Sequence, residues 1–130
     1  MLHKEYGRTG ITLGAIGCGG MRLPNPGNHA EGIEVLHAAR RAGITYFDTA
    51  PYYCDDQSEA IFGEALRSMP PSPLPLYVSS KCSRPEGSEF RRGLEQSLAR
   101  LGLSRIDFFH IWCVMDPADW QSRVDGGALQ

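Results

Sequence analysis

The 130-residue chain has little excess of one charge and no long apolar run, and these absences argue against several classes of protein. Its formal net charge is only -2 and it has no polybasic stretch, which argues against nucleic acid or an anionic membrane as a partner. No apolar run approaches the ~20 residues that span a bilayer. The first residues also lack the pattern of a signal peptide. We therefore expect a cytoplasmic protein.

The chain contains four cysteines, and their spacing is not that of a metal site. The sequence contains no CxxC pair and no histidine at zinc-ligand spacing from a cysteine. This pattern predicts free thiols in a reducing compartment and no metal. Each cysteine lies at or just after the end of an expected strand, which makes a metal or redox cluster conceivable, but packed thiols are the favoured interpretation. The four are Cys18, Cys54, Cys82 and Cys113.

The spacing of apolar residues predicts strands that alternate with helices. A hairpin turn is expected at residues 7–10, and Ser58 has the side chain of a helix cap. Gly43 and Gly102 are natural helix ends. The predicted strands are 13–20, 44–48, 76–80 and 106–112, the predicted helices are 30–42, 58–69 and 88–101, and a weaker helix is expected at 117–124.

This alternation predicts a parallel sheet with right-handed crossovers, either an open doubly wound sheet or part of an eight-stranded barrel. In both folds, chemistry lies at the carboxyl ends of the strands. Polar and ionisable residues gather at those ends in this sequence, namely Asp48, Tyr53, Lys81 and His110. The glycines around Cys18 are not a dinucleotide fingerprint, because Pro24 and Pro26 prevent a helix from starting directly after them.

Six segments together resemble the aldo-keto reductases, and they extend over nearly the whole chain. The longest are GITYFDTAPYY at residues 43–53 and SEAIFGEAL at 58–66. The others are YGRTG at 6–10, GGMRLP at 19–24, VSSK at 78–81 and LEQSLARLG at 94–102. The resemblance implies a (β/α)8 barrel of the TIM type. Residues 1–130 would be the N-terminal part of that domain, truncated after four strands and about three helices, with an N-terminal hairpin.

The resemblance also implies an NAD(P)H-dependent oxidoreductase that reduces aldehydes and ketones to alcohols by hydride transfer. Tyr53 would be the general acid, Lys81 its neighbouring cation and Asp48 the counter-charge that holds Lys81. A nearby ammonium favours the phenolate form of a tyrosine, so the three roles are consistent. The cofactor would be NADPH, and the positions expected near it are Gly20, Met21, Arg22 and Asp48.

The fourth catalytic residue of this family, a histidine, has two candidate positions in the last strand. The family's usual position corresponds to Trp112, and His110 lies two residues earlier. Side chains alternate along a strand, so these two residues share one face. The resemblance makes His110 the expected catalytic histidine, and a buried histidine bonded to a neighbour is the alternative.

Length separates this chain from a complete barrel, which needs ~250 residues. A sheet of four strands leaves two open edges, and open edges favour pairing with another chain, so a homo-oligomer is expected. Two other functions remain open: a non-catalytic NADPH-sensing or regulatory module on the same fold, and a flavodoxin-like domain. The second has no phosphate-binding loop after its first strand to support it.

Overall fold

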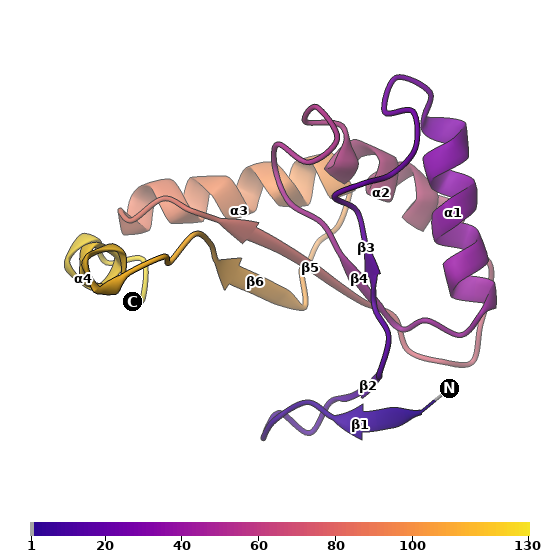
Figure 1. The fold of residues 1–130 in the computed structure, drawn as a ribbon, viewed down its shortest axis with the longest axis horizontal. Helices are drawn as coiled ribbons and strands as arrows, with labels where there is room; N and C mark the ends of the chain where they lie inside the picture. The colour runs from indigo at the N-terminus through magenta and orange to yellow at the C-terminus, as the bar shows by residue number, and fades with distance from the viewer. Residues whose placement is uncertain (1) are drawn as a thin grey trace.

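The structure is a computed structural model that describes residues 2–130, and it contains a hairpin, a four-stranded parallel sheet and four helices (Figure 1). The strands pair as β1–β2 in the antiparallel hairpin and as β3-β4-β5-β6 in the parallel sheet. The strands are β1 (His3–Glu5), β2 (Thr12–Gly14), β3 (Cys18–Gly19), β4 (Tyr46–Asp48), β5 (Tyr77–Cys82) and β6 (Phe108–Ile111). The helices are α1 (His29–Arg41), α2 (Ser58–Arg67), α3 (Gly87–Leu101) and α4 (Pro117–Gly126).

The predicted alternation of strands and helices is confirmed from residue 29 onward. Helices α1, α2 and α3 each link two neighbouring parallel strands and pack along the sheet, and α4 follows β6 (Figure 1). The helix predicted only weakly at the end is well formed as α4, because Asp116 caps it and Pro117 occupies its first turn. None of the helices among residues 2–130 has the length and apolar character to cross a lipid bilayer.

The single buried strand predicted at residues 13–20 is wrong. The structure divides this segment between β2, which pairs with β1, and β3, which pairs with β4. Between them the chain turns from the hairpin to the sheet, and Ile16 is 61% exposed there. The close packing expected of the small residues in this segment is confirmed at Gly17, where a β-carbon would lie 3.0 Å from the Tyr46 ring.

The hydrophobic core lies between the sheet and its helices. Alternate residues of β4 and β5 point toward the helices, so Phe47 and Val78 join the core. Helix α2 meets α3 closely at Gly63, where a β-carbon would lie 2.6 Å from the carbonyl oxygen of Arg100. The fully enclosed members of this core are Leu23, Leu36, Phe47, Ile61, Phe62, Ala65, Val78 and Leu101.

One buried ion pair ties these layers together. The Glu59 carboxylate of α2 is 1% exposed and accepts a hydrogen bond of 2.6 Å from Ser80 Oγ of β5. It also accepts one of 2.6 Å from Arg100 Nε of α3. Burying a carboxylate is costly unless it is paired and hydrogen-bonded, and Glu59 meets both conditions. The contact holds α2, α3 and β5 in fixed relation beneath the loops that follow β4 and β5.

Candidate active site

The loop after β4 carries Tyr53 and has an unusual backbone. Four residues of this loop that are not glycine have positive φ angles, between 52° and 68°: Tyr52, Cys54, Asp55 and Asp56. Such angles are uncommon and persist where the surroundings impose them. Here the backbone N–H of Ser58 donates to the carbonyl of Tyr53 at 3.1 Å, and Cys54 Sγ donates to the carbonyl of Gly20 at 3.2 Å. The loop is therefore tied to both α2 and the end of β3.

Asp48 and Lys81 form an ion pair at the carboxyl ends of β4 and β5. Lys81 Nζ lies 2.7 Å from Asp48 Oδ2 and 3.0 Å from Oδ1, so it donates to both carboxylate oxygens. Ser79 Oγ also donates to Asp48 Oδ1, at 2.7 Å. Asp48, Ser79 and Lys81 lie on the sheet face opposite the helices, because β4 and β5 direct alternate side chains to each face.

The Lys81 ammonium also approaches Tyr53, with Nζ 5.0 Å from the centroid of the tyrosine ring. Burial lowers the pKa of Lys81, but the hydrogen bond and charge of Asp48, with a smaller contribution from Tyr53, outweigh burial and raise the pKa above its ordinary value. Lys81 therefore stays protonated at neutral pH. The structure therefore brings together the three side chains that were predicted to act together, with the Lys81 ammonium between the Asp48 carboxylate and the Tyr53 ring.

His110 and Trp112 lie at different depths on the same face. The Trp112 ring meets the Tyr53 ring edge-on, with centroids 5.6 Å apart. His110 pairs with Lys81 in the register of β5 and β6, but its Nε2 lies 3.2 Å from the hydroxyl of Tyr46. Tyr46 begins β4, two residues before Asp48. His110 therefore lies one layer deeper than Tyr53, and its catalytic role stays a prediction.

A family model described as the aldo/keto reductase family matches residues 15–119, which is most of the chain. The chain belongs to the aldo/keto reductase family.

Two curated relatives and a solved structure agree with this assignment. The chain is 33% identical over 116 residues to L-galactose dehydrogenase from Arabidopsis thaliana, covering 82% of this chain and 36% of that protein. It is 30% identical over 122 residues to 6-dehydroglucose reductase from Novosphingobium aromaticivorans, covering 83% of this chain and 40% of that protein. An aldo-keto reductase structure from Pseudomonas aeruginosa matches with a TM-score of 0.79 and 26% identity, covering 98% of this chain and 54% of that one.

The chain thus spans less than half the length of these curated relatives and about half of the solved structure. The solved aldo-keto reductases are (β/α)8 barrels, so the predicted fold class is confirmed, with the four parallel strands forming part of such a barrel. The open doubly wound sheet and the flavodoxin-like domain are set aside by the same comparison.

Of the four residues of this aldo/keto reductase that were predicted to lie near the cofactor, Asp48 ends β4 and the other three follow β3. Met21 and Arg22 are exposed, and they line a pocket of about 320 Å³ together with Tyr53. Gly20 is buried instead, and its N–H donates to the carbonyl of Asp48 at 2.8 Å. A β-carbon there would lie 2.5 Å from both Phe62 and Ser58, so Gly20 allows the end of β3 to pack closely on α2.

Sequence reasoning did not identify Ser79, Arg84 or the contact of Trp112 with Tyr53. Ser79 was detectable, because it precedes Lys81 by two residues in one strand and so shares its face. Arg84 follows β5 and lines a second pocket of about 250 Å³, into which Lys81 and Trp112 also face. Among residues 2–130, no group of three or more His, Cys, Asp or Glu side chains is arranged to hold a metal.

Proposed function

We propose that this protein reduces aldehyde or ketone carbonyls to alcohols with NADPH, with Tyr53 as the general acid. The observation that carries the proposal is the position of the Lys81 ammonium. It lies 2.7 Å from the Asp48 carboxylate and 5.0 Å from the Tyr53 ring centroid. Membership of the aldo/keto reductase family supports the same reaction class.

Each of the three side chains has a separate task in the proton transfer. The Tyr53 hydroxyl donates its proton to the carbonyl oxygen of the substrate, which becomes the hydroxyl of the alcohol. The Lys81 ammonium stabilises the negative charge that is left on the tyrosine oxygen. Asp48, itself held by a hydrogen bond from Ser79, keeps the Lys81 side chain in place and charged. Because Lys81 is buried, water screens this charge less than it would at the surface.

The residues present fit one end of a nicotinamide cofactor. NADPH, when bound, supplies the hydride that the carbonyl carbon receives. Met21 and Arg22 are exposed beside Tyr53 in one pocket, so they are available to contact it. Asp48 lies next to them at the end of β4, where its backbone carbonyl holds Gly20. We assign Gly20, Met21, Arg22 and Asp48 to this end of the cofactor site.

Replacing the proposed acid tests this function. Tyr53→Phe removes the hydroxyl but keeps the ring that packs on Trp112, so folding and NADPH binding should persist. The turnover number with a simple aldehyde should fall by about a hundredfold to ten thousandfold. NADPH binding, followed by fluorescence titration, should change little. Tyr6→Phe is the matched control, since Tyr6 follows β1 and lines neither the pocket beside Tyr53 nor the one beside Lys81. Turnover by Tyr53→Phe at the wild-type rate would contradict the proposal.

A non-catalytic NADPH-binding module is the second candidate, and one observation favours it. Trp112 stands where the family usually has its histidine, and its ring packs against Tyr53. The indole of Trp112 does not supply the imidazole that would orient the carbonyl of a substrate. Saturable NADPH binding without turnover of any of a panel of aldehydes and ketones would favour this function over the reductase.

We also propose that the chain associates with a second copy. The sheet of residues 2–130 ends at β3 on one side and β6 on the other, and eight strands are needed to close the barrel of its family. The edge strands of a second copy would pair with these two open edges through backbone hydrogen bonds. Sedimentation should give about twice the monomer mass of 14.3 kDa. A monomer that melts cooperatively would overturn this proposal.

A further inference from the structure

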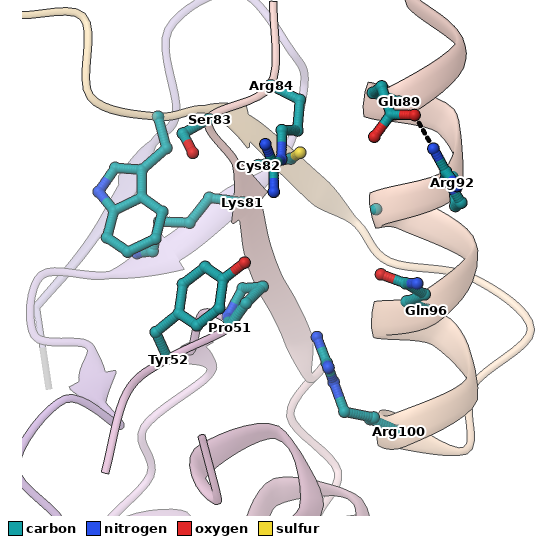
Figure 2. Close-up of a pocket in the computed structure, with 12 residues that line it drawn as sticks. Pro51, Tyr52, Lys81, Cys82, Ser83, Arg84, Glu89, Arg92, Gln96 and Arg100 are labelled. Atoms are coloured by element: carbon teal, nitrogen blue, oxygen red, sulfur yellow. Dashed lines mark ion pairs between the residues drawn. The ribbon is translucent and has the colours of Figure 1, made fainter. Parts of the chain in front are cut away.

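A pocket of about 250 Å³ lies above the carboxyl end of β5, and the proposed proton transfer leaves most of it unused. Figure 2 shows side chains from three segments facing it: Tyr52 from the loop after β4, Arg84 from the loop after β5, and Arg92 from α3. Gln96 and Arg100 follow Arg92 on the same face of α3, at intervals of four residues. The pocket is therefore assembled by the fold rather than by one flexible segment.

Positive charge dominates this pocket. Four of its lining residues are basic, namely Lys81, Arg84, Arg92 and Arg100, and one is acidic, namely Glu89. Three of the four cations already have a carboxylate partner: Lys81 pairs with Asp48, Arg92 with Glu89 and Arg100 with Glu59.

Arg84 is the exception. It forms no hydrogen bond or ion pair with any other residue between 2 and 130, although it faces the pocket (Figure 2). Its guanidinium is planar and carries five N–H donors in a fork that matches a carboxylate or a phosphate. The neighbouring side chains of Ser83 and Gln96 can donate further hydrogen bonds. The lining thus offers hydrogen-bond donors and one positive charge that has no carboxylate partner in the described part of the chain. A bound anion would accept those hydrogen bonds and balance that charge.

We propose that this pocket binds an anionic group of the carbonyl substrate, a carboxylate or a phosphate, with Arg84 as its charged partner. The inference rests on the proposed reductase function and adds the substrate class. Lys81 and Trp112 line the pocket and also contact Tyr53, so the anion lies beside the reacting carbonyl. The substrate is therefore a small oxo acid or oxo phosphate, such as an aromatic aldehyde that carries its anionic group on the same ring.

Binding of product-like alcohols tests the pocket without cofactor or turnover. The probes are 4-(hydroxymethyl)benzoate, 4-(hydroxymethyl)phenyl phosphate and uncharged 4-methylbenzyl alcohol, titrated into the 15N-labelled chain. The indole N–H signal of Trp112, which lines the pocket, reports binding, and that of Trp120, which lies on α4, is an internal control. Both anions should shift the Trp112 signal saturably while the uncharged alcohol should not. The tighter of the two anions identifies the source of the charge.

Removing the unpaired charge gives the decisive comparison. Arg84→Gln should weaken binding of the anions roughly fivefold, the effect expected for an exposed charged contact. Arg91→Gln removes an exposed arginine of α3 that does not line this pocket, so it should leave binding unchanged. Equal binding of the uncharged alcohol, or no effect of Arg84→Gln, would overturn the inference. Failure of the reductase function would appear separately, as loss of NADPH binding or turnover with these titrations intact.

Discussion

The two faces of the four-stranded sheet differ in what fills them. On the face toward the helices, Phe47 and Val78 are at most 2% exposed and pack against apolar residues of α1, α2 and α3. On the opposite face, Tyr46, Asp48 and His110 are only half-buried. Tyr46 and His110 hydrogen-bond to each other, and Asp48 accepts hydrogen bonds from Ser79 and Lys81 of β5. The first face holds the fold together, and the second keeps polar groups open to ligands.

The largest expected effect comes from removing a core side chain on the helix-covered face of the sheet. Phe62→Ala removes a ring that is 1% exposed at the centre of the core, and it should lower the free energy of unfolding by about 3–5 kcal/mol. Phe108→Ala is the matched change on the opposite face, where the ring is half-buried and stacks edge-on with Tyr6 and Tyr46.

Phe108→Ala should cost less than Phe62→Ala, because less apolar surface leaves water when Phe108 folds into place. Urea titrations followed by circular dichroism measure both variants against the wild type. Equal losses would mean that the two faces contribute alike to stability, and the comparison between them would fail.

Much of the fold and part of the site were predictable from the sequence. Periodic apolar residues identify α1, α2 and α3, and Asp48 and Lys81 each end a predicted parallel strand, so their meeting follows from topology alone. The turn at residues 15–17 was not predictable, since small apolar residues are compatible with a buried strand as well as with a turn. The contact of Tyr46 with His110 joins residues 64 positions apart, and it depends on the exact strand register.

The next effect concerns pH and the Lys81–Asp48 pair. The pKa of Lys81 is raised in the folded protein above its ordinary value of 10.5, so the pair's contribution to stability is fully present below 10.5 and is lost as pH rises through the higher folded value. One retained proton changes the free energy of unfolding by at most about 1.4 kcal/mol per pH unit. Between about pH 10 and pH 12, the wild type should therefore lose stability more steeply than Lys81→Met.

Urea unfolding at a series of alkaline pH values measures this difference in slope. The double variant Asp48→Asn with Lys81→Met controls for the carboxylate that the single change leaves without a partner. Its slope should match that of Lys81→Met, because neither protein retains the titrating ammonium. If the wild type and both variants lose stability in parallel, the pair does not hold the proton of Lys81.

The smallest expected effect separates the two interpretations of His110. Tyr46→Phe removes the hydroxyl that lies 3.2 Å from His110 Nε2 and should cost about 1 kcal/mol of unfolding free energy, a typical value for one hydrogen bond. Tyr46 lies beneath the ion pair, and burial raises the pKa of its phenol, so it stays protonated and acts only as a hydrogen-bond partner.

If His110 only anchors the deeper layer, His110→Gln should give a stability loss of the same small size and leave turnover within about threefold of the wild type. If His110 is catalytic, His110→Gln should lower the turnover number by about a hundredfold while Tyr46→Phe, which keeps the imidazole, does not.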